Sequence, residues 1–184
     1  TQKNLNVQSI LALNWYQTSA EVRALYYQAF NMARLALDKN TQGVDKPAVV
    51  VDIDETILDN SPYQARLIGK NEGYNTKSWN AWCTEADAKA VPGALSFLKY
   101  ADKKGVTIFY LSNRSEDVRE ATIKNLKKLG FPQVRDEQVL LKTETSNKDA
   151  RRARVKENYK SVLLAGDNLN DFNNLTADKS IEER

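Results

Sequence analysis

An apolar run that ends in two acids constrains this chain more than any other feature. Residues 48–51 are one alanine and three valines, and Asp52 and Asp54 follow with one residue between them. A short valine-rich run is typical of a strand that is buried on both faces. Open α/β sheets bind their ligands at the carboxyl ends of such strands. The stretch predicts a central strand with a functional site at its end, although an acidic turn after a core strand would also explain the two acids alone.

Further apolar runs, alternating with helical patterns, predict the rest of the sheet. In chain order we expect a helix at 94–104, a strand at 106–111, a helix at 116–129, a strand at 139–141, a basic helical stretch that includes Lys148 and Arg154, and a strand at 161–165. Strands that alternate with helices indicate a parallel sheet with helices on both faces. The expected fold class is therefore α/β, with a Rossmann-like sheet.

Residues 1–46, before the first strand, predict a helical extension. Thr18 and Glu21 fit a capping box in which Thr18 is the N-cap residue. From Val22 to Leu37 apolar residues recur at helical spacing, which predicts an amphipathic helix that runs to about Asp38. We expect this extension to pack on the core through its apolar face.

Residues 59–93 predict a small insertion above the site. The segment is far longer than an ordinary connection between a strand and a helix, which takes about 2–6 residues. Its aromatic side chains would either contact a ligand or hold the insertion together. They include Tyr63, Tyr74, Trp79 and Trp82.

Four acids follow two of the predicted strands. Asp52 and Asp54 follow the first strand, and Asp167 and Asp171 follow the strand at 161–165. Clustered carboxylates raise one another's pKa unless a cation holds them together. Mg²⁺ suits such a cluster, because it takes a few carboxylates, keeps waters and binds substrate phosphate. These four residues therefore predict a Mg²⁺ site.

The composition excludes several classes of hydrolase. The chain has no histidine, so histidine-nucleophile phosphatases, Ser-His-Asp hydrolases and HExxH zinc enzymes are ruled out. Six positions after the single cysteine, Cys83, stands Lys89, so the CxxxxxR loop of tyrosine phosphatases is missing and we expect a thiol without function. The net charge of +3, spread along the chain, argues against a nucleic-acid polymer as partner.

Two motifs together resemble a known family. Residues 52–56 read DIDET, with Asn60 and Tyr63 behind them, and residues 166–172, after the last predicted strand, read GDNLNDF. This combination resembles the haloacid dehalogenase-like phosphatases, and more narrowly the bacterial class C acid phosphatases of the lipoprotein e (P4) type, over about residues 8–175. The resemblance implies Mg²⁺-dependent hydrolysis of phosphomonoesters, of the 5′-nucleotidase type in some relatives.

The resemblance also implies roles for the acids. Asp52 would be the nucleophile that forms an aspartyl-phosphate, and Asp54 the general acid and base. The carboxylate of Asp52, the backbone carbonyl of Asp54 and the carboxylate of Asp167 would bind the metal. Asp171 would act indirectly or through water.

The phosphate would be bound by residues of two further segments. Ser112 and Asn113 follow the second strand and would hold phosphoryl oxygens, although each would also serve as a helix cap. Lys148 matches the family's phosphate lysine best, and Lys142 is the alternative. If the aromatics of the insertion contact the ligand, they would select its leaving group.

With this resemblance, residues 47–58 and 94–184 are expected to form the phosphatase core and residues 59–93 a cap. The expected partner is a small phosphomonoester, and a homodimer stays open. Relatives are exported and held by an N-terminal lipid, so we expect an extracytoplasmic protein, a cell-surface or outer-membrane lipoprotein in its precursor. The chain, which starts at Thr1 and shows no anchor, would be its soluble part. Relatives also continue beyond the position of Phe172 with a further strand and helix.

Two other functions stay open at this stage. A non-catalytic surface module for binding or adhesion would keep the fold, but it has no use for Asp54 beside Asp52. A phosphotransferase or a phosphonatase would use the same scaffold. Phosphonatase chemistry needs a Schiff-base lysine in the cap, and Lys70, Lys77 and Lys89 stand in no clear motif.

Overall fold

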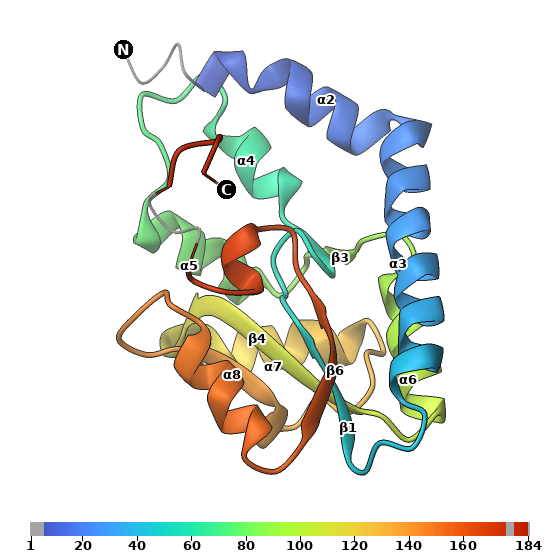
Figure 1. The fold of residues 1–184 in the computed structure, drawn as a ribbon. Helices are drawn as coiled ribbons and strands as arrows, with labels where there is room; N and C mark the ends of the chain where they lie inside the picture. The colour runs from blue at the N-terminus through green and yellow to red at the C-terminus, as the bar shows by residue number, and fades with distance from the viewer. Residues whose placement is uncertain (1–5, 176–178, 184) are drawn as a thin grey trace.

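The computed structural model describes residues 6–175 and 179–183 (Figure 1). The first five residues of the predicted extension, and residues 176–178 and 184 of the predicted core, lie outside these described residues. A four-stranded sheet has the order β5-β4-β1-β6, and every neighbouring pair is parallel. Its strands are β1 (Pro47–Val51), β4 (Thr107–Ser115), β5 (Val139–Lys142) and β6 (Lys160–Ala165). The predicted α/β fold with a parallel sheet is confirmed.

The valine-rich strand β1 is central and buried, as its composition predicts. Val49 pairs with Ile108 of β4 on one side and with Leu163 of β6 on the other. Residues 48–51 are at most 5% exposed. Because side chains alternate along a strand, Val49 and Val51 enter one hydrophobic cluster and Ala48 and Val50 enter another on the opposite face.

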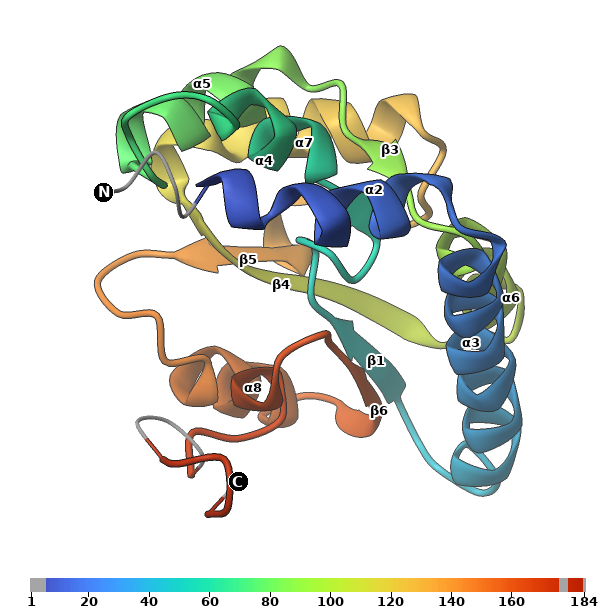
Figure 2. The same cartoon turned by 90° about the horizontal axis from the view of Figure 1, so that it is seen from above.

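Helices cover both faces of the sheet (Figure 2). The larger cluster, on one face, receives Phe30 of α3, Phe97 of α6 and Leu126 of α7. The smaller cluster, on the other face, receives Val155 of α8. These helices are α3 (Ala20–Asn40), α6 (Ala94–Lys103), α7 (Arg119–Lys128) and α8 (Asp149–Lys156). Short 3₁₀ turns are η1 (Glu116–Val118), η2 (Asp136–Gln138) and η3 (Leu169–Asp171).

Two predicted boundaries were wrong. The strand expected at 106–111 continues to Ser115, so Ser112 and Asn113 lie within β4 rather than after it. The helix expected at 116–129 is divided into the turn η1 and the helix α7. The strand continues because its last residue, Ser115, still pairs with Lys142 of β5.

The predicted N-cap of the long helix was also wrong by one residue. Thr18 is the last residue of α2 (Ile10–Thr18), and its hydroxyl donates to the carbonyl of Asn14. Ser19 has extended backbone angles and its side chain accepts a hydrogen bond from the backbone N–H of Val22. Ser19 is therefore the N-cap of α3, because a residue that still belongs to the preceding helix cannot adopt the extended N-cap conformation.

The segment 59–93 starts and ends in a small antiparallel ladder. In this ladder β2 (Leu58–Asp59) pairs with β3 (Lys89–Ala90), and between them lie α4 (Ser61–Leu67) and α5 (Thr76–Glu85). Helix α4 packs against α2, and α5 packs against α7. Phe30 of the extension, Trp82 of this segment and Val49 of the sheet belong to one hydrophobic cluster. The division into extension, cap and core stays a prediction.

Within the described residues, no helix has both the length and the apolar character needed to span a lipid bilayer.

Candidate active site

The end of β1 is joined directly to the end of β6. The backbone N–H of Asp52 donates to the carbonyl of Ala165 at 2.9 Å. The chain then turns within a few residues, since the backbone N–H groups of Ile57 and Leu58 both donate to the carbonyl of Ile53. This arrangement brings Asp52 and Asp54 to the same edge of the sheet as the acids that follow β6.

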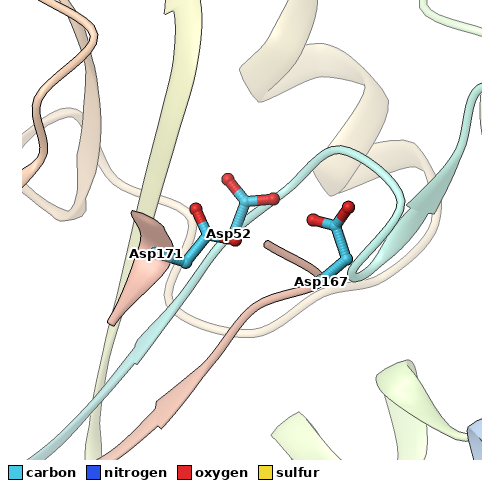
Figure 3. A group of neighbouring side chains, drawn as sticks. All are labelled: Asp52, Asp167 and Asp171. Carbon is cyan, nitrogen blue, oxygen red and sulfur yellow. The ribbon is translucent and has the colours of Figure 1, made fainter. Parts of the chain in front are cut away.

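Three of the four predicted acids form one cluster. Asp52, Asp167 and Asp171 each offer a carboxylate oxygen within 4.8 Å of the others. Figure 3 shows Asp52 between the other two, with all three side chains directed toward a common space. The hydroxyl of Thr56 lies 3.2 Å from an oxygen of Asp52 and 3.2 Å from an oxygen of Asp167. Thr56, the last residue of the DIDET motif, therefore links the ends of β1 and β6.

Lys148 is the positive group of this cluster. The side chain of Lys148 is 5% exposed, and its ammonium group bonds to Asp52 and lies 2.6 Å from an oxygen of Asp171. Burial raises the pKa of Asp52 to about 7, the charge of Lys148 opposes this effect, and the charges of Asp54 and Asp171 add to it. Burial and the neighbouring Asp171 likewise raise the pKa of Asp167. Three carboxylates against one ammonium group leave an excess of negative charge.

The cluster fits a divalent cation with oxygen ligands. The carboxylate oxygens of Asp52 and Asp167 and a carbonyl at the turn are the ligand types that Mg²⁺ prefers. Asp171, expected to act indirectly, has its carboxylate in the cluster and one oxygen bonded to Lys148. Gly166 makes room for it, because a Cβ atom at this position would lie 2.8 Å from the Cγ atom of Asp171.

Asp54 has different neighbours from those of Asp52. Its carboxylate accepts hydrogen bonds from the hydroxyl of Ser112, the Nε of Arg114 and the amide of Asn60, each at 2.9 Å. Arg114 is 1% exposed and also donates to Thr122 and to the amide oxygen of Asn60. Donors on three sides hold the carboxylate of Asp54 in one orientation.

Sequence reasoning missed Arg114 and gave Asn60 no role. Asn60 is fully buried and bonds to Asp54, Arg114 and the indole N–H of Trp82. The signal for Arg114 was a charged residue three positions after a strongly apolar run. Such a residue is expected to be paired when it is buried.

The residues predicted to bind phosphate differ in their exposure to solvent. Ser112 is fully buried, and its hydroxyl donates to Asp54 and accepts from the backbone N–H of Arg114. Asn113 is exposed, and its side-chain oxygen accepts from Arg151. Lys148 contacts the acids, whereas Lys142 lies in the ladder opposite Ser115. The geometry favours Lys148 over Lys142.

The four aromatic residues of the insertion fall into two groups. Tyr63, Tyr74 and Trp79 form a cluster with ring centroids 5.1–6.4 Å apart. Tyr63 is 2% exposed and Tyr74 is 63% exposed, so the cluster reaches from the core to the surface. Trp79 also lies 5.8 Å from the guanidinium of Arg114. Trp82 is 4% exposed and bonds to Asn60.

Comparison with protein families gives a match over residues 1–184, to the acid phosphatases described as HAD superfamily, subfamily IIIB. Among solved structures, the chain is similar to a class C acid phosphatase from Bacillus anthracis with tungstate bound. That match has a TM-score of 0.92 and 45% identity, and covers 98% of this chain and 76% of the other. A second structure of a class C acid phosphatase from Bacillus anthracis gives a TM-score of 0.88 and 46% identity, covering 93% and 73%.

More distant relatives come from plants. An acid phosphatase 1 from Solanum lycopersicum is 31% identical over 129 residues, which are 67% of this chain and 51% of the relative. A stem 31 kDa glycoprotein from Glycine max is 30% identical over 129 residues, with the same coverage. The chain thus spans about half the length of these curated relatives. The match over residues 1–184 shows that the chain belongs to the acid phosphatases of subfamily IIIB in the HAD superfamily.

Proposed function

We propose that this protein hydrolyses phosphomonoesters in a Mg²⁺-dependent reaction that passes through a phosphorylated Asp52. One observation carries the proposal: the two acids of the DIDET motif have opposite surroundings. Asp52 lies among acids and beside Lys148, whereas Asp54 is surrounded by hydrogen-bond donors. Two carboxylates with different environments suit two different roles in one reaction.

Asp52 is the nucleophile in this proposal. One of its carboxylate oxygens forms a bond to phosphorus while the bond from phosphorus to the ester oxygen breaks, and the product is an acyl phosphate. In the second step a water oxygen bonds to phosphorus and the bond to Asp52 breaks, which releases inorganic phosphate and regenerates the carboxylate. Lys148 neutralises negative charge at Asp52 and on the phosphoryl oxygens.

Asp54 moves the proton in both steps. Its carboxyl group gives a proton to the leaving ester oxygen, and the resulting carboxylate then takes a proton from the attacking water. The donors Ser112, Arg114 and Asn60 keep this group oriented between the two steps. Ser112 and Asn113 are also proposed to hold phosphoryl oxygens, which for Ser112 requires a change of its present hydrogen bond.

The metal belongs to the same proposal. Acid phosphatases of this superfamily are metal-dependent, and the described residues include an acidic cluster that can hold an ion. Asp52, Asp167 and the carbonyl of Asp54 would bind Mg²⁺, with Asp171 beside them. When bound, the ion shields the charge between the carboxylates and the phosphate.

Nucleoside monophosphates are the proposed substrate class. Tyr63, Tyr74, Trp79 and Trp82 are the four insertion residues predicted to contact substrate, and of these Trp79 and Tyr74 combine an aromatic face with exposure. Stacking of a base on such a ring contributes roughly 1–3 kcal/mol. Tyr63 and Trp82 are buried and are better suited to support the other two.

The test is release of inorganic phosphate from a panel of phosphomonoesters, with and without EDTA. We expect release only when Mg²⁺ is present, and none from the Asp52→Asn variant. Activity that persists in EDTA would contradict the proposed metal dependence, and activity in Asp52→Asn would contradict the proposed phosphorylated Asp52. Three further predictions need separate tests. Cell fractionation would test the extracytoplasmic location and the lipid anchor of the precursor, and light scattering would test the homodimer.

A further inference from the structure

A tyrosine of the N-terminal helices contacts the catalytic turn directly. The hydroxyl of Tyr26, on α3, donates to the backbone carbonyl of Glu55 at 2.7 Å. Glu55 follows Asp54 in the chain. The contact therefore reaches the residue next to the proposed acid from a helix that precedes the whole sheet.

Glu55 has a backbone conformation that needs support. Its φ is 58°, in the left-handed region that residues with a side chain rarely adopt. Such conformations persist when the surrounding contacts hold them. The N–H of Glu55 donates to the carbonyl of Leu58 at 2.9 Å, and its carboxylate accepts from the backbone N–H of Asn60 at 3.0 Å. The hydroxyl of Tyr26 binds the remaining backbone group.

A second tyrosine orients the first. The hydroxyls of Tyr16 and Tyr26 lie 2.6 Å apart, and their rings meet edge to face. Each phenol has one proton, and a carbonyl can only accept. Because Tyr26 gives its proton to Glu55, Tyr16 must donate to Tyr26. Burial raises the pKa of both phenols, so both keep the proton that this chain of hydrogen bonds requires.

The same turn carries the groups that hold Asp54. Asn60 binds Asp54 through its side-chain amide and Glu55 through its backbone N–H. The bond from Tyr26 holds the peptide between Glu55 and Thr56. A rotation of this peptide would change the backbone angles of Glu55, which is bonded to Asp54 through its nitrogen and to Asn60 through its carboxylate, and so would move both Asp54 and Asn60. We propose that Tyr26 is a positioning residue for Asp54, and that the N-terminal helices support the catalytic turn through this one contact. This inference rests on the proposed role of Asp54 as the proton donor.

The test compares single-hydroxyl variants on two substrates in the presence of Mg²⁺. p-Nitrophenyl phosphate has a leaving group that needs little protonation, whereas glycerol phosphate depends on a general acid. For Tyr26→Phe we expect kcat on glycerol phosphate to fall roughly tenfold, equivalent to about 1.4 kcal/mol. KM should stay within about twofold, because the hydroxyl of Tyr26 is bonded to Glu55 and to Tyr16 and would act on the chemical step through Asp54. The loss of kcat on p-nitrophenyl phosphate should be clearly smaller.

Two further variants make the comparison specific. Tyr27→Phe removes a phenol hydroxyl from the next position of the same helix, where the side chain is 46% exposed, and should leave kcat unchanged on both substrates. Tyr16→Phe leaves the hydrogen bond from Tyr26 to Glu55 in place, so it should lower kcat on glycerol phosphate less than Tyr26→Phe does. Thermal unfolding of each variant shows that the assays compare folded proteins.

The outcomes separate this inference from the proposed function. Asp54→Asn should lose far more kcat/KM on glycerol phosphate than on p-nitrophenyl phosphate, because kcat/KM reports the first step, whereas the role of Asp54 as base in the second step lowers kcat on both substrates. Suppose that Asp54→Asn shows this selectivity. If kcat of Tyr26→Phe is then unchanged, or falls by the same factor on both substrates, the positioning role of Tyr26 is wrong and the role of Asp54 stands. If Asp54→Asn shows no such selectivity, the acid role fails, and the inference fails with it.

Discussion

The two sides of the catalytic turn differ in how their charges are balanced. On the Asp52 side, three carboxylates share one ammonium group, that of Lys148. On the Asp54 side, one carboxylate accepts hydrogen bonds from Arg114, Ser112 and Asn60. The first side keeps an excess of negative charge that a bound cation would offset, whereas the carboxylate of the second side already has its donors. The difference teaches that residues two positions apart can have opposite surroundings when their partners come from different elements of the fold.

The largest expected effect on activity comes from removing the carboxylate of Asp52. Asp52→Asn keeps the shape of the side chain but removes the proposed nucleophile, so turnover should fall on the order of 10³-fold or more. The fold should remain, because the amide still fills the same space. Phosphate release and circular dichroism measure the two effects. Near-native turnover in this variant would show that no phosphorylated Asp52 is formed.

Removing Arg114, the charged partner of Asp54, should lower the stability of the fold as well as the activity. Arg114→Met leaves a carboxylate without its buried cation, and such a loss costs about 3 kcal/mol of unfolding free energy. Urea unfolding measures the change. Lys128→Met, which removes an exposed partner of Asp87, is the control and should leave the unfolding midpoint unchanged.

A double variant sharpens this test. When Asp54→Asn is added to Arg114→Met, the uncompensated charge disappears, and a large part of the lost stability should return. If the double variant is as unstable as the two losses added together, the pair is not energetically coupled and the contrast between the two sides is weaker than the geometry indicates.

Within the Asp52 side, Asp167 and Asp171 should differ. Asp167 is bridged to Asp52 by Thr56, whereas Asp171 is bonded to Lys148. We expect Asp167→Ala to weaken Mg²⁺ binding on the order of 10–100-fold, and Asp171→Ala to weaken it less. Calorimetric titration with Mg²⁺ alone measures both. A larger loss in Asp171→Ala would reverse the proposed order of the ligands.

The smallest expected effect is on substrate choice. Trp79→Ala should lower kcat/KM for a nucleoside monophosphate roughly tenfold and leave glycerol phosphate nearly unchanged. Trp82→Ala is the control, because Trp82 is 4% exposed. Its loss should destabilise the fold and lower kcat/KM for both substrates by a similar factor. Equal losses on both substrates in Trp79→Ala would show that the aromatic cluster only holds the insertion together.

The sequence by itself determined the sheet and the acids at its edge. The valine run at 48–51, the apolar runs that became β4, β5 and β6, and the acids at 52, 54, 167 and 171 are all local signals. A strand pattern needs only its own residues to be recognised, and the ends of parallel strands meet at one edge whatever the details of packing. Element ends were less certain, as the N-cap at Ser19 and the extension of β4 to Ser115 show.

The tertiary structure alone decided which side chains meet at that edge. Arg114 binds a carboxylate 60 positions earlier in the chain, Lys148 binds one 96 positions earlier, and Tyr26 binds a carbonyl 29 positions later. No local pattern encodes such pairs, because each depends on where separate elements pack and on which rotamers burial leaves open. Asp52 and Asp54 look equivalent in the motif, and only these distant partners make them different.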